Sequence, residues 1–344
     1  MLIAPTPTNK MTKKYQLLLH IGLYKTATSS LQHNVLYSLY QEGKINFLGG
    51  VWRVGANQSQ DSDFYPFSKY RNELIRNGGG GRFSHAEVVN LRGEVEALLV
   101  ENKLNVLSDE NFSSPITSNT DNVLYNLKQI FINCDVKVLI SLRQPVDLVF
   151  SFYVQTYHSR FHHDKHRNTF EKFAQHLLNN IDSKAYLAFL FEEYLALLDT
   201  YFSNTSIMLF EDLIHDQDCY FTTLSTLLKI DKNDIKSKFL TKKQNTRGTT
   251  STGKKSRAIP WERVINQKLG FLKNSPLKRI WLLKYPWRLL LKILSKFKVS
   301  GMVEHKYPDA KLSAELIQAL GIKDIDKFAK QYNLDKDKLV RYRY

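Results

Sequence analysis

The chain has 344 residues, of which 43% are hydrophobic and 24% are charged, a composition that excludes the disordered and fibrous classes. The formal net charge is +16, but the eighteen Lys and Arg residues between Lys236 and Lys298 accompany a single acid, Glu262, so this stretch carries +17 and the remainder −1. A positive excess confined to one segment argues against general nucleic-acid binding and favours a local anionic partner.

The cysteine content and the first residues bear on the compartment. Cys134 and Cys219 are too few and too far apart for a disulfide framework or a zinc cage, so a reducing, cytoplasmic environment is expected. Residues 1–14 lack the apolar core of a signal peptide and are expected to form a loose leader.

Short apolar runs alternate with helical patterns along the chain. Their length and aliphatic content are typical of buried parallel strands. The runs are Tyr15–His20, Leu104–Ser108, Val136–Leu142 and Ser206–Phe210. This alternation predicts an α/β fold, a three-layer sandwich with a central parallel sheet flanked by helices, and ligand sites at the carboxyl ends of the strands.

The domain organisation follows from the same patterns. Residues 15–255 are predicted to form the core. Within it, residues 49–82 are rich in glycine and poor in periodic apolar positions, which predicts a long loop or lid. Residues 256–344 are predicted to form a helical, basic C-terminal region packed on or next to the core.

The first loop carries the most informative pattern, His20-Ile-Gly-Leu-Tyr-Lys25-Thr-Ala-Thr-Ser-Ser30-Leu-Gln32. It places a lysine and several hydroxyls between a strand and a helix, where free backbone N–H groups can cradle a phosphate. A nucleoside-triphosphate P-loop requires glycine directly before the lysine, and here Tyr24 precedes Lys25. The alternative is a capped helix with Lys25 in solvent.

This loop resembles that of the sulfotransferases that use 3′-phosphoadenylyl sulfate (PAPS), a P-loop NTPase-like fold, and is most similar to bacterial members. The resemblance implies that Lys25 contacts the transferring group. It also implies a set of residues that bind the 5′-phosphosulfate, namely Thr26, the backbone of Ala27, Thr28, Ser29 and Ser30. Ala27 stands where glycine is commoner, a change that is harmful only if this backbone needs a positive φ. Ser29 replaces a second threonine and keeps the hydroxyl.

Two later segments provide candidate contacts for the 3′-phosphate of the same nucleotide. Arg143-Gln-Pro145 follows a predicted strand and opens a helix, and Ser151 lies eight residues after Arg143, the spacing of the family's 3′-phosphate pair. The alternative is that Arg143 pairs with Asp147 while Ser151 faces the sheet. The segment Gln244–Lys255 resembles the family's loop over the 3′-phosphate, with Arg247 as its candidate contact, and the alternative is a solvated linker.

The candidate base follows the second predicted strand, in Asp109-Glu110-Asn111-Phe112. By resemblance Glu110 is the leading base and Asp109 the alternate, whereas an acid pair that caps a helix remains open. His20 is expected either to support the site residues from behind or to serve packing, and the segment Ile207–Leu213 to serve as scaffold. No metal is expected, and His158, His162, His163 and His166 are expected to form a polar turn.

The predicted function is a PAPS-dependent transferase (sulfotransferase) that passes the sulfuryl group to a hydroxyl or amine of an acceptor. A carbohydrate or surface glycan is favoured only by analogy with bacterial relatives. The alternatives are a nucleotide kinase with a variant P-loop and a non-catalytic module that binds adenosine 3′,5′-bisphosphate (PAP) or a glycan.

The basic segment leaves three partners open. In Leu282–Phe297, four basic residues, Lys284, Arg288, Lys292 and Lys296, are spaced by four and share one helical face. Residues 265–300 could bind anionic lipid, pack with a solvated basic face, or hold an anionic glycan. The expected location is cytoplasmic, with peripheral contact at the inner face of the membrane as the lipid-binding alternative.

Overall fold

The computed structural model describes residues 14–50, 64–77, 81–113, 119–240, 255–260 and 298–344. Two compact units divide the chain: one comprises Met1–Arg53, Asp61–Gln244 and Asp309–Tyr344, and the other Val54–Gln60 and Asn245–Pro308. The strands are β1 (Tyr15–Gly22), β2 (Asn46–Phe47), β3 (Leu104–Ser108), β4 (Cys134–Leu142), β5 (Thr205–Leu209), β6 (Lys255–Pro260) and β7 (Lys298–His305).

Helices connect and follow these strands. The α-helices are α1 (Thr28–Ser30), α2 (Tyr37–Gln41), α3 (Ser68–Asn72), α4 (His85–Glu96), α5 (Thr120–Ile130), α6 (Pro145–Thr156), α7 (Phe170–Asn179), α8 (Phe191–Tyr201), α9 (Asp212–His215), α10 (Gln217–Leu228), α11 (Lys232–Leu240), α15 (Ala310–Leu320), α16 (Ile325–Tyr332) and α17 (Lys336–Tyr342). The π-helical stretches are η1 (Leu31–Leu36), η2 (Glu73–Asn77) and η4 (Tyr157–Phe161), and the 3₁₀ helices are η3 (Glu110–Ser113) and η5 (Lys184–Phe189).

The first unit is built on a five-stranded sheet of order β2-β3-β1-β4-β5 in which every pairing is parallel. The three-layer α/β fold with a central parallel sheet is therefore confirmed, and each of the four predicted strands is present. The short strand β2 was not predicted, because two residues carry no periodicity. Parallel strands end at one edge of the sheet, so the segments after β1, β3 and β4 lie next to one another.

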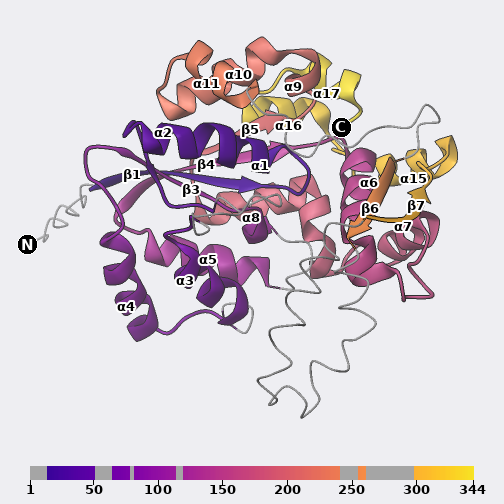
Figure 1. The fold of residues 1–344 in the computed structure, drawn as a ribbon, viewed down its shortest axis with the longest axis horizontal. Helices are drawn as coiled ribbons and strands as arrows, with labels where there is room; N and C mark the ends of the chain where they lie inside the picture. The colour runs from indigo at the N-terminus through magenta and orange to yellow at the C-terminus, as the bar shows by residue number, and fades with distance from the viewer. Residues whose placement is uncertain (1–13, 51–63, 78–80, 114–118, 241–254, 261–297) are drawn as a thin grey trace, which may run out of the picture. The chain divides into compact units, whose positions relative to one another are not determined.

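Helices cover both faces of this sheet (Figure 1), with α1 and α2 on one side and α5 and α8 on the other. The central strand β1 is buried along nearly its whole length, which explains its continuous apolar run. On the first face, Val35 and Leu39 pack with Phe221 of α10 and Phe239 of α11. The sheet is thus held rigidly from both sides, and so is the edge where its loops emerge.

The prediction that residues 49–82 form a loop rather than core is wrong for residues 64–77. Here α3 continues into η2, and Phe67 and Leu74 are fully buried. Phe67, Tyr70 and Leu74 recur at helical spacing, a pattern that the glycines on either side obscured. Phe67 stacks on Phe131, just after α5. These residues belong to the hydrophobic core, so the segment that carries them is fixed in place.

The C-terminal region differs in part from the helical prediction for residues 256–344. Helices α15, α16 and α17 are present and belong to the first unit, but β6 and β7 form an antiparallel pair in the second unit. The predicted basic helix at 282–297 and the loop with Arg247 lie outside the described residues. Among the helices that the structure describes, none combines the length and apolar character needed to cross a bilayer.

Candidate active site

The loop between β1 and α1 has an unusual backbone. Lys25 and Ala27 have positive φ angles of 70° and 62°, whereas Thr26 between them does not. Alternation of this kind turns successive N–H groups toward one side and forms a concave anion site. Ala27 is the N-cap of α1, and no side chain caps this helix end. Donors for an anion are therefore available from the loop and from the start of the helix together.

The hydroxyls predicted to bind the nucleotide divide into two groups. Thr26 and Thr28 are buried, and the Thr26 hydroxyl donates to the Leu23 carbonyl at 2.7 Å, which holds the loop from inside. Ser29 and Ser30 are half-buried, as is Lys25. Gly22 is required by close packing, because a Cβ at this position would overlap the Thr28 side chain.

Arg143 links the second segment to this loop. Its Nη1 donates to the Lys25 carbonyl at 2.9 Å, and its guanidinium lies 4.6 Å from the centroid of the Phe210 ring. Arg143 also meets Asp147 at 3.5 Å, so the alternative pairing considered from the sequence is present as well. The Arg143 side chain is 13% exposed, and its Nε is buried with no partner among the described residues. One donor of the guanidinium thus remains for a ligand.

The corner between β4 and α6 is fixed by hydrogen bonds around Arg143. Pro145 occupies the first turn of α6, and the Gln144 side chain caps the helix by accepting from the Asp147 N–H at 2.8 Å. The Gln144 N–H donates to Glu211 at 3.0 Å. Ser151, further along α6, is buried.

Glu211 is itself held by the last residue of the sequence. The Tyr344 hydroxyl, from a side chain that is 3% exposed, donates to the Glu211 carboxylate. Burial raises the pKa of Glu211, while these hydrogen bonds favour its ionised form. Glu211 lies in the segment Ile207–Leu213, which was predicted only as scaffold, and nothing in the sequence indicated that Tyr344 would contact it.

Asp109, the alternate base, is fully engaged in structure. Its Oδ1 accepts from the N–H and the side-chain amide of Asn111, at 2.8 and 2.6 Å. Its Oδ2 accepts from Arg71 at 2.7 Å and from the Tyr65 hydroxyl. With four donors and 4% exposure, this carboxylate is a connector between segments.

Glu110, the leading base, lies in a different environment. It is half-buried in η3, and its carboxylate takes no hydrogen bond from the residues that the structure describes. Burial, reinforced by the Asp109 charge, raises the pKa of Glu110 to about 7, although Lys25 and Arg71 act in the opposite direction. Lys25 and Glu110 follow the neighbouring parallel strands β1 and β3 at the same edge of the sheet. A carboxyl with this pKa can exchange a proton near neutral pH.

His20 forms part of a buried polar cluster beneath the loop. Its Nδ1 lies 2.8 Å from the Ser108 hydroxyl, which also accepts from the Gln32 amide at 3.1 Å. Burial lowers the pKa of His20 to about 4, so its ring is neutral. The cluster joins β1 to β3 directly before Asp109 and Glu110, a placement that fits both packing and support of the site residues from behind.

Four other histidines were predicted to form a polar turn. His162, His163 and His166 are exposed, while the side chain of His158 lies outside the described residues. Within the part of the chain that the structure describes, no group of three His, Cys, Asp or Glu side chains is placed to bind a metal.

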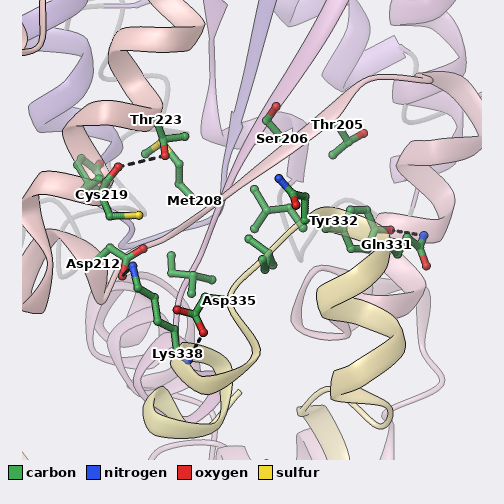
Figure 2. A pocket seen from close by; sticks show the side chains of 15 residues that line it. Thr205, Ser206, Met208, Asp212, Cys219, Thr223, Gln331, Tyr332, Asp335 and Lys338 are labelled. Carbon is green, nitrogen blue, oxygen red and sulfur yellow. Dashed lines mark hydrogen bonds and ion pairs between the residues drawn. The ribbon is translucent and has the colours of Figure 1, made fainter.

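A separate cavity of about 400 Å³ lies along β5, the edge strand of the sheet. Figure 2 shows its walls: β5 and α10 contribute Ser206 and Cys219, and the C-terminal helices contribute Tyr332 and Lys338. Lys338 pairs with Asp212 at 3.0 Å. None of the predicted site residues lines this cavity, so it is distinct from the candidate active site.

Comparison with known proteins adds similarity to solved structures. No protein-family model matches the chain, and no curated protein matches it. Among solved structures, the chain is similar to a sulfotransferase from Alicyclobacillus acidocaldarius, with 18% sequence identity and a TM-score of 0.36, over 63% of this chain and 81% of that chain. The α/β fold described above is established by the sheet order and registers of this chain itself.

Proposed function

We propose that this protein transfers a sulfuryl group from PAPS to a hydroxyl or amine of an acceptor. The observation that supports the proposal is that Lys25, Glu110 and Arg143 follow three adjacent parallel strands, β1, β3 and β4, at one edge of the sheet. Arg143 bonds to the Lys25 backbone, and the Lys25 charge acts on Glu110. A cation, a base of near-neutral pKa and a backbone anion site together suit transfer of a charged group.

The donor end is the loop of Lys25 and Ala27. Its N–H groups and the half-buried Ser29 and Ser30 would bind the 5′-phosphosulfate. Tyr24 in place of glycine argues against a nucleoside triphosphate, and the motif as a whole resembles the PAPS enzymes. Arg143 at the adjoining corner would read the 3′-phosphate through its buried Nε, with Ser151 and Arg247 as further candidate contacts.

The transfer assigns a role to each charged residue. The acceptor oxygen attacks sulfur as Glu110 takes its proton, and a new S–O bond forms. The bond between sulfur and the bridging phosphate oxygen breaks, and its electron pair stays on that oxygen, which leaves as part of PAP. Lys25 would stabilise the charge that develops there, as cations do in phosphoryl transfer through a loose transition state.

The acceptor class is a further part of the proposal. A carbohydrate or surface glycan is consistent with the bacterial character of the loop motif, and the basic segment between Lys236 and Lys298 offers charge for an anionic glycan or membrane surface. A cytoplasmic location, with peripheral membrane contact as the alternative, belongs to the same proposal.

Competitive binding of PAP and ADP to the full chain tests the donor, and Lys25→Ala tests the chemistry. We expect PAP to bind more tightly than ADP. Lys25→Ala should lower the rate of sulfuryl transfer from PAPS by about 100-fold or more, because charge on the leaving oxygen loses its counterion. Lys69→Ala is the matched control, since Lys69 pairs with Glu94 at the surface and should leave the rate unchanged.

Three outcomes would contradict the proposal. Preference for ADP with Mg²⁺-dependent phosphoryl transfer would indicate a kinase. PAP binding without turnover on any acceptor would indicate a binding module. Full activity of Lys25→Ala would remove the catalytic assignment, whatever the nucleotide preference.

A further inference from the structure

Arg71 forms a largely buried ion pair directly beside Glu110. Its Nε lies 2.7 Å from Asp109 Oδ2, and the two side chains are 20% and 5% exposed. A buried pair of this kind is weak support for stability, because the cost of removing both charges from water offsets much of their attraction. Its presence next to the candidate base therefore suggests a role for the charges themselves.

The pair also connects three segments around the site. Tyr65 and Arg71 come from residues 64–77, and both donate to Asp109 at the end of β3. Asn111 donates to the same carboxylate, and its side-chain oxygen accepts from the Tyr24 hydroxyl at 3.4 Å, next to Lys25. Because Asp109 has all its acceptor positions filled, it cannot turn toward a substrate.

We propose that the Arg71–Asp109 ion pair balances the charge beside Glu110, and that Arg71 is a positioning residue for the base. This inference rests on the proposed function, since it takes Glu110 as the base. Asp109 is needed to fix the loop, yet its negative charge opposes ionisation of Glu110. Arg71 offsets that charge while it holds Asp109 in place, so that Glu110 can lose its proton near neutral pH.

The charged groups near Glu110 support this balance. Burial is the largest cause of the raised pKa of Glu110. The Asp109 charge raises this pKa further, whereas Lys25, after β1, and Arg71, in α3, lower it. His20 of β1 adds no charge, because burial keeps its pKa near 4. Arg71 and Lys25 thus both lower the pKa of Glu110, against the effect of the neighbouring Asp109 carboxylate.

Helix α5 also packs against η3, but its charged side chains are engaged elsewhere. Asp121 accepts from Arg82 at 3.3 Å and from the Tyr201 hydroxyl at 2.5 Å. Lys128 lies 5.8 Å from the centroid of the Phe202 ring. The charge balance at Glu110 is therefore set mainly by Asp109, Arg71 and Lys25.

Loss of the Arg71 charge and loss of the Asp109 charge should shift the pKa of Glu110 in opposite directions. Without Arg71, the Asp109 charge is uncompensated and Glu110 binds its proton more tightly, which raises its pKa. Without the Asp109 charge, Arg71 is uncompensated and the pKa of Glu110 falls. If the two substitutions only disrupted the loop, the pKa of Glu110 would not be expected to rise in one variant and fall in the other.

The experiment is a ¹³C NMR titration of the full chain labelled at the glutamate side-chain carboxyl, from about pH 5 to about pH 9. Glu110→Gln assigns the Glu110 resonance. We expect the midpoint to move up by about one pH unit in Arg71→Gln and down by about as much in Asp109→Asn. Arg71→Lys keeps the charge and should stay close to wild type. Arg82→Gln, which removes an exposed cation paired with Asp121, should leave the midpoint unchanged.

Unchanged midpoints in Arg71→Gln and Asp109→Asn, or shifts in the same direction, would overturn the inference. If circular dichroism shows that Arg71→Gln does not fold, Asp109→Asn and Arg71→Lys carry the test. The titration needs no turnover, so it also separates the two proposals. A wild-type chain without PAP binding or sulfuryl transfer would overturn the proposed function even where the opposite shifts are observed.

Discussion

Ala27 has a backbone conformation that alanine adopts only at a cost. At φ 62° and ψ 17° it lies in the left-handed region, where a Cβ crowds the following carbonyl. The conformation persists because the loop is fixed on both sides by the Thr26–Leu23 hydrogen bond and by the bond from Arg143 to the Lys25 carbonyl. Ala27 thus holds strain in the loop to which the proposed function assigns anion binding.

We expect Ala27→Gly to stabilise the protein by about 0.5–1 kcal/mol, because relief of the left-handed strain exceeds the extra freedom that glycine gives the unfolded chain. Urea unfolding measures the change. PAP affinity should be retained, since the backbone N–H groups are the same.

The matched control is Ala314→Gly, at an exposed position within α15, which should destabilise by about 1 kcal/mol because no strain is relieved there. Loss of stability of similar size in both variants would show that Ala27 is not strained in solution.

The local sequence around Asp109 and Glu110 does not decide which of the two acids is the candidate base. Asp109 and Glu110 are adjacent, and both were candidate bases. The two carboxylates differ in their hydrogen bonds. Tyr65 and Arg71, more than thirty residues earlier in the chain, donate to the Asp109 carboxylate and not to that of Glu110. The candidate residues could be predicted, but the division of roles between them depends on long-range contacts that carry no local pattern.

At the scale of elements, the strands were predictable because burial on both faces produces continuous apolar runs, as in β1 and β4. The helical segment of residues 68–77 was not, since its apolar residues are few and lie between glycine-rich stretches. Because Lys25, Glu110 and Arg143 each follow a predicted parallel strand, the strand assignment alone predicted that all three lie at the same edge of the sheet. The contact of Tyr344 with Glu211 required the whole fold.

That contact holds the corner that presents Arg143. Glu211 accepts from the Gln144 N–H and from the Tyr344 hydroxyl, so loss of the hydroxyl leaves a buried carboxylate with one partner fewer. We expect Tyr344→Phe to cost about 1–2 kcal/mol of stability and to weaken PAP binding several-fold, with little change in kcat. Calorimetric titration with PAP and urea unfolding measure the two effects.

Tyr332→Phe provides the comparison, because the Tyr332 hydroxyl also donates to a carboxylate, Asp199, at 2.8 Å, but from α16. This variant should leave PAP affinity unchanged. Equal PAP affinity in Tyr344→Phe and wild type would contradict the positioning of Arg143 by the corner, even if stability falls.

At the scale of the whole molecule, the basic segment does not mark the end of the part of the chain that packs into the first unit. The stretch from Lys236 to Lys298 carries the entire positive excess, yet α15, α16 and α17 follow it and belong to the first unit. Their buried residues include Leu316, Phe328 and Leu339. The pattern of charge therefore marks a segment between two parts of one unit rather than the end of the core.

This organisation predicts opposite results for two alterations of the chain. Truncation after Pro308 removes α15, α16 and α17, and with them several fully buried side chains, each worth about 2–5 kcal/mol. Because a folded protein is stable by only about 5–15 kcal/mol, the truncated chain should fail to unfold cooperatively. Replacement of residues 245–308 by a Gly-Ser linker of equal length keeps those helices, and the melting temperature should change by only a few degrees.

Differential scanning calorimetry of both variants beside wild type makes the measurement. The truncation keeps the basic segment and loses the C-terminal helices, whereas the linker variant loses most of the basic segment and keeps those helices, so the two transitions show which of these parts the folded core requires. A cooperative transition in the truncated chain, at the temperature of the linker variant, would show that the core is complete without residues 309–344. In that case the Tyr344–Glu211 contact would not be required for the core to fold.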